Sequence, residues 1–252
     1  MHKYALVVID MQRGFLDPSS PLYIAGAADT VPACARAIDC CHRAGVPVVF
    51  AVRHYRADGS DVERARYDVW AKGGKPLSET CPASMSDAWP EEFRRAPSDY
   101  VIVKPRFSAF FHTELDLILR RLDIRTVILT GTTTPNCIRT SCYDAMALEY
   151  NTVVLTDCCS SHTEEIQRVN LEDMARAGAI LMDSASFADY GPGTVEDLSA
   201  AIAFAPADDA DIAISVMLEL GDNANYIIRQ VLDAYYGTDT PAEPTGSSAA
   251  EG

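Results

Sequence analysis

The sequence lacks several features that would place it in other classes of protein. No apolar run approaches the roughly 18–20 residues that a membrane-spanning helix needs, so we do not expect a membrane protein. Basic residues are scarce, with 21 lysines and arginines against 36 acidic residues and a formal net charge of -15. Such a charge argues against nucleic acid or an anionic membrane surface as a partner. The sequence also shows no internal repeat.

Cysteine spacing typical of zinc sites is missing as well. The chain has eight cysteines, but none of them forms a CxxC pair, so a structural zinc site is not expected. Two pairs are directly adjacent, Cys40–Cys41 and Cys158–Cys159, and we expect no signal peptide. These features favour reduced thiols in a cytoplasmic protein over a disulfide framework.

What the sequence does contain is an alternation of strand and helix patterns. Strands are expected at residues 4–9, 46–52, 100–104, 127–129, 152–156 and 179–182. Helices are expected at residues 28–42, 112–122, 135–149 and 163–177. This alternation predicts a three-layer α/β/α fold with a six-stranded, mainly parallel sheet. The length of 252 residues is sufficient for one large domain of this kind.

The domain organisation follows from the same patterns. Residues 1–190 are predicted to form the main domain and residues 191–237 a helical extension, with helices at 195–204 and 222–236. Residues 238–252 are rich in proline, glycine, serine and alanine, which predicts a flexible tail. Within the main domain, residues 53–99 are polar and contain several prolines. They predict a long excursion at a strand end, where such segments often line a site.

The most informative stretch covers residues 126–140. An apolar run ends at Gly131, and Thr134 and Pro135 suit an N-cap and a first helical position. Cys137 is then expected in the first helical turn, where the helix dipole and free N–H groups tend to lower a thiol pKa. A reactive nucleophile with an oxyanion site is one interpretation. A buried structural cysteine is the alternative.

Two further reactive residue types are expected beside this turn. Asp10 lies directly after one predicted strand and Lys104 is the last residue of another, and sites in parallel sheets lie beyond the carboxyl ends of the strands. A carboxylate can take the thiol proton and return it to a leaving amine, while an ammonium group stabilises both charges. Each residue also has a simpler interpretation, since Asp10 could begin a loop and Lys104 could be a solvent-exposed charge.

Three motifs together resemble the isochorismatase-like cysteine hydrolases, over about Tyr4 to Asp183. The motifs are Ala5–Gln12 with Phe15 and Pro18, Lys104–Phe110, and Thr130–Ile138, with later matches at Asp157 and around His162. This family includes nicotinamidases, N-carbamoylsarcosine amidohydrolases, and ureidoacrylate and biuret hydrolases. The presence of Cys137 places the resemblance with the amide-cleaving members.

The resemblance implies a role for each matched residue. Asp10 would be the general base and acid, Lys104 would orient and stabilise the pair, and Cys137 would be the nucleophile. A cis peptide bond would fall between Thr132 and Thr133. The N–H groups of Thr133 and Cys137 would then form the oxyanion hole.

The implied activity is cleavage of a carbon–nitrogen bond in a small amide, carbamoyl or ureido compound through a thioester, with no cofactor. Family members are commonly oligomers, so a homo-oligomer is expected. Two alternatives remain open. One is a lactam- or antibiotic-opening hydrolase on the same fold, and the other is a non-catalytic binding protein that keeps the pocket.

The chain departs from the nicotinamidases where they carry an Asp-x-His metal motif. The corresponding stretch here is Arg53–Arg56, which lacks the carboxylate, so no bound metal is predicted and His54 is interpreted as a pocket or loop residue. Arginines could bind a carboxylate or ureido group and aromatic rings could form an apolar wall, although surface exposure or core packing would explain the same residues. The substrate-binding candidates are Phe15, Arg53, Arg106, Phe107 and Asn136.

Overall fold

The computed structural model describes residues 4–190, 198–204 and 213–219 of the chain. The chain divides into two compact units, residues 1–196 and 197–252. No helix in the described ranges is both long and apolar enough to cross a lipid bilayer.

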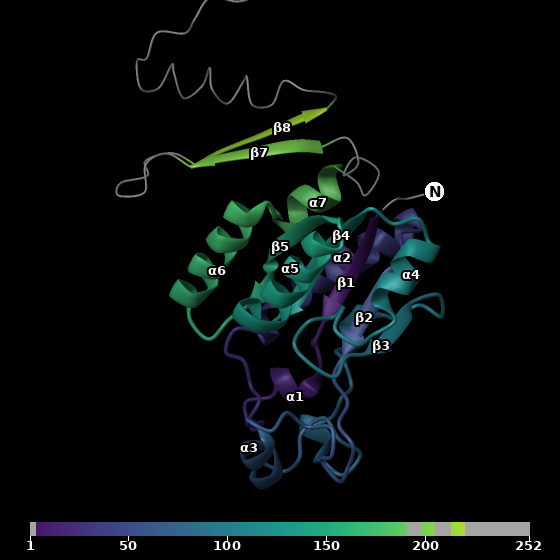
Figure 1. The fold of residues 1–252 in the computed structure, drawn as a ribbon, viewed down its shortest axis with the longest axis vertical. Helices are drawn as coiled ribbons and strands as arrows, with labels where there is room; N and C mark the ends of the chain where they lie inside the picture. Colours follow the sequence, from purple (N-terminus) through teal and green to yellow (C-terminus); the bar gives the residue numbers. More distant parts are fainter. Residues whose placement is uncertain (1–3, 191–197, 205–212, 220–252) are drawn as a thin grey trace, which may run out of the picture. The chain divides into compact units, whose positions relative to one another are not determined.

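The first unit is built on a six-stranded sheet in the order β3-β2-β1-β4-β5-β6, and every neighbouring pair is parallel (Figure 1). The strands are β1 (Tyr4–Ile9), β2 (Val48–Val52), β3 (Tyr100–Val103), β4 (Thr126–Thr132), β5 (Asn151–Ser160) and β6 (Ile180–Met182). Strands β1 and β4 are buried along their whole length, which explains the nearly continuous apolar sequence of β1 and the apolar run at residues 127–129 in β4. The predicted α/β fold with a six-stranded parallel sheet is confirmed.

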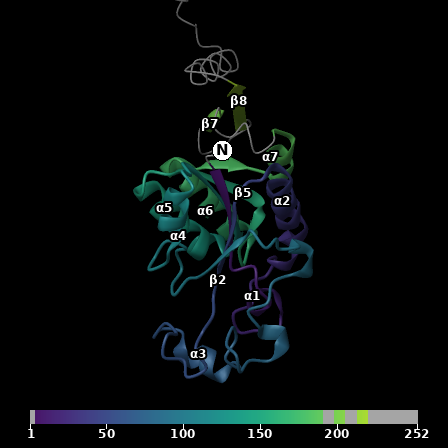
Figure 2. The same ribbon diagram turned by 90° about the vertical axis from the view of Figure 1, so that its right-hand side faces the viewer.

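Helices cover both faces of this sheet. The α-helices are α1 (Arg13–Leu16), α2 (Val31–Ala44), α3 (Tyr67–Lys72), α4 (Leu115–Arg121), α5 (Arg139–Ala147), α6 (Glu164–Ala177) and α7 (Ser184–Tyr190). Short helical turns lie at η1 (Ala28–Thr30), η2 (Ala83–Met85), η3 (Glu91–Phe93) and η4 (Thr134–Ile138). Figure 2 shows α4, α5 and α6 on one side of the sheet and α2 and α7 on the other, so the unit has three layers.

Strand β5 is longer than predicted. The apolar pattern predicts an end before Asp157, but the strand continues to Ser160. The register between β4 and β5 shifts after Leu129, so that Gly131 pairs with Cys159 and Thr132 with Ser160. This irregular pairing carries β5 alongside the end of β4, and no local sequence pattern signals it.

The described part of the second unit is an antiparallel pair of strands, β7 (Leu198–Phe204) and β8 (Ala213–Glu219), with Leu198 opposite Glu219. The helix predicted at residues 195–204 is therefore wrong over its described part. A mainly apolar stretch of this length is too short for its periodicity to distinguish helix from strand, and pairing with β8 decides the outcome. The helix predicted at 222–236 and the tail at 238–252 lie outside the described residues.

Candidate active site

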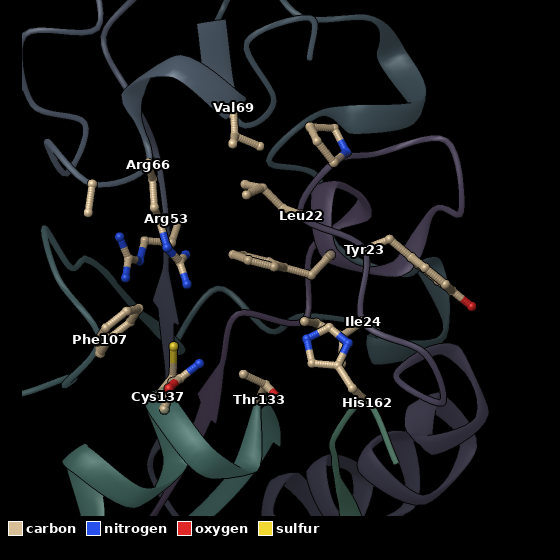
Figure 3. Close-up of a pocket in the computed structure, with 14 residues that line it drawn as sticks. Leu22, Tyr23, Ile24, Arg53, Arg66, Val69, Phe107, Thr133, Cys137 and His162 are labelled. Atoms are coloured by element: carbon tan, nitrogen blue, oxygen red, sulfur yellow. The ribbon is translucent and has the colours of Figure 1, made fainter. Parts of the chain in front are cut away.

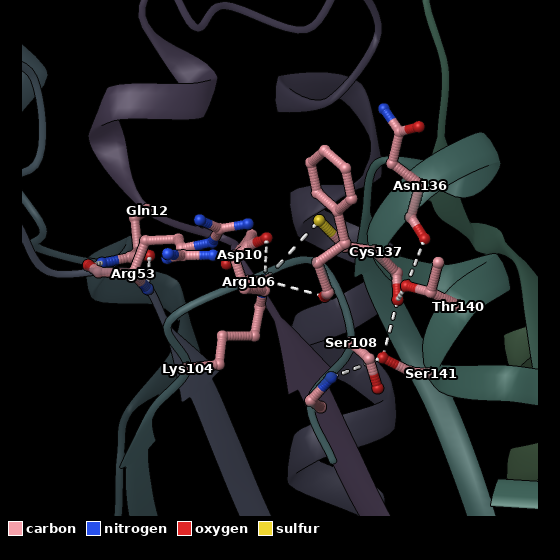
Figure 4. Close-up of polar contacts among 12 residues, drawn as sticks. Asp10, Gln12, Arg53, Lys104, Arg106, Ser108, Asn136, Cys137, Thr140 and Ser141 are labelled. Atoms are coloured by element: carbon pink, nitrogen blue, oxygen red, sulfur yellow. Dashed lines mark hydrogen bonds and ion pairs between the residues drawn. The ribbon is translucent and has the colours of Figure 1, made fainter. Parts of the chain in front are cut away.

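Three side chains from the carboxyl ends of three strands meet at one point (Figure 4). Asp10 follows β1, Lys104 follows β3, and Cys137 lies in η4, directly after β4. Lys104 Nζ lies 2.7 Å from Asp10 Oδ2 and 3.6 Å from Cys137 Sγ. The side chains of Asp10 and Lys104 are fully buried. The structure thus brings together the acid, the ammonium group and the thiol that the sequence analysis grouped.

The position of the Lys104 ammonium group is determined by more than its two charged or reactive neighbours. Lys104 Nζ also donates hydrogen bonds to the carbonyl oxygens of Arg106 and Phe107, at 3.1 and 3.0 Å. These acceptors come from the loop that follows β3, so the backbone itself orients the ammonium group. Carbonyl and carboxylate partners together hold this buried group at a defined place.

The Asp10 carboxylate is buried but not saturated with partners. Its contact with Lys104 is an ion pair, and neither Asp10 oxygen accepts a well-aligned hydrogen bond from the residues that the structure describes. Its backbone has a φ of 54°, in the left-handed region, and turns the chain immediately after β1. The carboxylate therefore has free lone pairs beside the thiol and can accept a proton.

The thiol of Cys137 differs from the expectation of a lowered pKa. Burial raises the pKa of Cys137 most, and the negative charge of Asp10 raises it further. The charges of Lys104 and Arg53 lower it, but they do not outweigh the first two effects. Burial and the charge of Asp10 therefore disfavour the thiolate, and a neighbouring base can assist in forming the nucleophile. The predicted lowering of the Cys137 pKa is therefore wrong. The sequence indicates where the helix starts, but it does not indicate how deeply the thiol is buried.

The turn that carries Cys137 is attached to the end of β5. The peptide bond between Thr132 and Thr133 is cis, at the position that the resemblance implied. Thr133, not Thr134, is the N-cap residue of η4. The hydroxyl groups of Thr133 and Thr134 both donate to the carbonyl oxygen of Ser160, at 3.1 and 3.0 Å. The predicted capping role of Thr134 is wrong because its hydroxyl is engaged with the neighbouring strand.

A cavity of about 210 Å³ opens above the thiol (Figure 3). Four of the predicted substrate-binding residues line it: Phe15, Arg53, Phe107 and Asn136. Arg106 is not among the residues that line it, so its substrate-binding role stays a prediction without support from this cavity. The Arg106 side chain is exposed, and its guanidinium group donates to the carbonyl oxygen of Asp61 at 3.1 Å and to that of Pro105. These carbonyl groups hold it outside the cavity.

Other lining residues were not found from the sequence. They are Pro21, Leu22, Tyr23, Ile24, Ala65, Arg66, Val69 and His162. Most belong to the loop after α1 and to the long excursion between β2 and β3, which the sequence analysis identified only as a region that could line a site. Their individual positions depend on how these loops fold back over the sheet edge, and no local pattern indicates it.

Arg53 is the first residue of the stretch Arg53–Arg56, which follows β2. Its buried guanidinium group pairs with Glu63 at 2.5 Å and donates to the Tyr55 hydroxyl at 2.8 Å. Burial acts to lower the pKa of Arg53, but the charges of Asp10 and its other neighbours raise it above its ordinary value, so it stays a cation. His54 contacts Asp87 at 2.8 Å and does not line the cavity.

No group of three or more His, Cys, Asp or Glu side chains in the described residues is arranged to hold a metal ion. The chain itself places an acid, a thiol and cationic groups at the site. These groups can perform proton transfer and nucleophilic attack.

The chain is similar to proteins of one family in both sequence and fold. The sequence model of the isochorismatase domain matches residues 4–186. A probable inactive nicotinamidase of Arabidopsis thaliana is 36% identical over 69% of this chain and 89% of its own. A maleamate amidohydrolase of Pseudomonas putida is 29% identical over 68% of this chain and 79% of its own. The crystal structure of an isochorismatase family protein from Desulfovibrio vulgaris is 37% identical, with a TM-score of 0.69, and the match covers 75% of this chain and 98% of that one.

Proposed function

Because the chain belongs to the isochorismatase family, we propose that it is a cysteine-dependent amidohydrolase that cleaves a carbon–nitrogen bond, other than a peptide bond, in a small amide, carbamoyl or ureido compound. Amide hydrolysis is the activity named for the maleamate amidohydrolase among its relatives. The observation that carries the proposal is the buried contact of Lys104 with both Asp10 and Cys137, at the base of a cavity.

The reaction begins with proton transfer from Cys137 Sγ to the Asp10 carboxylate. The raised pKa of Cys137, which follows from its burial and from the charge of Asp10, makes this transfer necessary before attack. The thiolate then attacks the substrate carbonyl carbon, and Lys104 stabilises the negative charge on sulfur at 3.6 Å. Asp10 returns the proton to the leaving nitrogen as the carbon–nitrogen bond breaks.

The N–H groups of Thr133 and Cys137 stabilise the oxyanion that forms on the carbonyl oxygen. Loss of ammonia or an amine leaves a thioester between Cys137 and the acyl group. Asp10, again a carboxylate, takes a proton from water, and the resulting hydroxide attacks the thioester carbonyl. The carbon–sulfur bond breaks, the thiol is regenerated with the proton held by Asp10, and the acid leaves.

Replacement of the nucleophile tests this mechanism. Ammonia release would be measured with the purified chain on a panel of small amides, carbamoyl compounds and ureas, and then with Cys137→Ala on the substrates that are turned over. We expect turnover to fall by at least about 10⁴-fold. Asp10 and Lys104 act only through the thiol of Cys137, so they cannot form the covalent intermediate without it. Circular dichroism should be unchanged, since only one sulfur atom is lost.

Cys142→Ala is the matched control. Cys142 lies on α5, is also fully buried and is not among the residues that line the cavity. Its replacement should leave turnover within about threefold while lowering stability modestly. Retained activity in Cys137→Ala would disprove the nucleophile assignment. Absence of turnover on every compound would favour a binding protein with a retained pocket over an enzyme.

A further inference from the structure

A second buried cation lies near the candidate nucleophile, and the proposed reaction gives it no role. The Arg53 side chain is only 1% exposed, and Arg53 and Cys137 are both among the residues around the same cavity (Figure 3). The charge of Arg53 interacts with Asp10 and with Cys137, the two groups of the proposed proton transfer. Arg53 therefore acts on the same pair as Lys104 does, from the end of a different strand.

The backbone of Arg53 is fixed by a side chain from the segment after β1. Gln12 is fully buried, and its amide oxygen accepts a hydrogen bond from the Arg53 N–H at 2.7 Å (Figure 4). The amide nitrogen of Gln12 donates to the Arg53 carbonyl oxygen, also at 2.7 Å. These buried hydrogen bonds are costly to break, because each would leave a polar group without a partner. The segment that supplies Asp10 thus also sets the position of Arg53.

The guanidinium group of Arg53 is fixed by side chains of two loops. Arg53 Nη1 donates to the Tyr55 hydroxyl at 2.8 Å and pairs with Glu63 at 2.5 Å. The Tyr55 hydroxyl donates in turn to the other carboxylate oxygen of Glu63, at 2.8 Å. The guanidinium carbon also lies 5.6 Å from the centre of the Phe107 ring, whose face attracts a cation. Because several groups share this task, the loss of one of them leaves the cation in place.

We propose that Arg53 is a positioning residue of the catalytic centre, whose fixed charge stabilises the negative charge that forms on Cys137 Sγ when the thiol gives its proton to Asp10. Burial and the charge of Asp10 both disfavour the thiolate, so a second cation in addition to Lys104 offsets a real cost. Glu63 has a different role, because it balances the charge of Arg53 and thereby makes the burial of this cation possible. The assignment rests on the proposed function, since it concerns the nucleophile of that reaction.

A purely structural ion pair is the alternative. Arg53 and Glu63 would then only attach the long excursion to the edge of the sheet, and the ionisation of Cys137 would not depend on them. The two interpretations differ in one observable, because a positioning role depends on the charge of Arg53 and not on whether the ion pair is intact. The charged groups that act on Cys137 are Asp10, Lys104 and Arg53, so the first two are left unchanged in the test.

The test compares loss of the ion pair with loss of the cation. Alkylation of Cys137 by iodoacetamide at a series of pH values, followed by peptide mass spectrometry, gives the pH of the half-maximal rate. Arg53→Met/Glu63→Gln removes both charges and leaves no buried ion unpaired, and we expect this pH to rise by about half a unit or more. In Glu63→Gln the ion pair is lost, but Arg53 keeps its charge and its contacts with Gln12 and Tyr55, so this pH should not rise.

Arg56→Met/Asp58→Asn is the matched control. These residues form an ion pair in the same excursion, their side chains are 68% and 60% exposed, and neither is among the residues that line the cavity. Alkylation of Cys137 should keep its pH dependence in this variant. Arg53→Gln is a second way to remove the cation, with an amide that can still donate to Tyr55, and it should raise the pH of the half-maximal rate as the double variant does.

Three results would overturn the assignment. They are an unchanged pH dependence in both Arg53 variants, an equal rise in Glu63→Gln or in the control, and failure of both Arg53 variants to fold by circular dichroism, which would make the pair structural. Each of them leaves the proposed amidohydrolase function intact. If the unmodified chain turns over no compound of the panel, the proposed function fails, and the alkylation of Cys137 still decides the role of Arg53.

Discussion

Replacing Lys104 by methionine should lower both stability and thiol reactivity, because this lysine compensates a buried charge. Its ammonium group lies 2.7 Å from Asp10 Oδ2, and both side chains are fully buried. Methionine has a similar length but no charge, so it would leave the Asp10 carboxylate buried without its ion-pair partner. Two carbonyl groups, those of Arg106 and Phe107, would also lose a donor.

The expected cost is about 3–5 kcal/mol in the free energy of unfolding, the range measured when one partner of a buried ion pair is removed. For a domain of the size of the first unit, residues 1–196, each kcal/mol corresponds to a change in Tm of about 2–4 °C. The variant should therefore melt about 6–20 °C lower. Urea unfolding followed by tryptophan fluorescence or circular dichroism would measure the same difference at constant temperature.

The double variant Asp10→Asn/Lys104→Met should recover about half or more of this loss, since it removes the uncompensated charge as well. Lys72→Met is the control. Lys72 is exposed on α3, and its replacement should change stability by less than about 0.5 kcal/mol. If Lys104→Met is as stable as Lys72→Met, or if the double variant is the least stable of all, the two charges are not coupled and the reasoning is refuted.

Lys104→Met should also change the pKa of the Cys137 thiol. The charge of Lys104 lowers the pKa of Cys137, against the larger raising effects of burial and of Asp10. Loss of that charge should move the pH at which Cys137 is alkylated at half its maximal rate to a higher value. Mass spectrometry after iodoacetamide treatment at a series of pH values would measure this shift. A shift to lower pH would contradict the assigned electrostatics.

Two further predictions concern the backbone and the pH dependence. Gly131 has a φ of 115°, and a Cβ there would lie 2.0 Å from the carbonyl oxygen of Ile9, so Gly131→Ala should destabilise the chain by more than about 3 kcal/mol. Gly45→Ala, where a Cβ meets nothing within 4 Å, should cost only about 1 kcal/mol, and similar melting points would refute the difference. Although partial burial acts to raise the pKa of Glu63, the charge of Arg53 lowers it. Glu63 therefore contributes stability above the ordinary glutamate pKa, and this contribution is lost as pH falls through the lowered pKa of the folded state. The decrease in Tm between neutral and acidic pH should be smaller in Glu63→Gln than in the unmodified chain, and thermal melts at a series of pH values would measure it.

The fold could be predicted because its signals are local. Buried parallel strands require continuous apolar runs, and the chain between them must form helices to return to the same edge of the sheet. The run at Tyr4–Ile9 therefore indicated β1, and Asp10 directly after it was placed at the carboxyl edge. The same reasoning placed Lys104 and Cys137 there, and the structure shows that all three meet.

The errors arose where distant segments decide the outcome. The strand β7 depends on pairing with β8, and the extension of β5 depends on a register shift against β4. The hydroxyl of Thr134 donates to the carbonyl oxygen of Ser160 on the neighbouring strand β5 instead of capping its own helix. Each of these choices is made by a partner that lies elsewhere in the chain, so the local residues were compatible with more than one result.

The order of residues along the chain was enough to establish a parallel α/β sheet and to place an acid, an ammonium group and a thiol at one edge, because strand direction alone carries strand ends to that edge. Folding decided the direction of the pKa shift of that thiol, since the pKa depends on burial and on the charges of Asp10, Lys104 and Arg53, which follow three different strands. Folding also positioned Arg66 on the cavity wall and Arg106 outside it. Both are arginines in loops, and only the path of those loops in space distinguishes them.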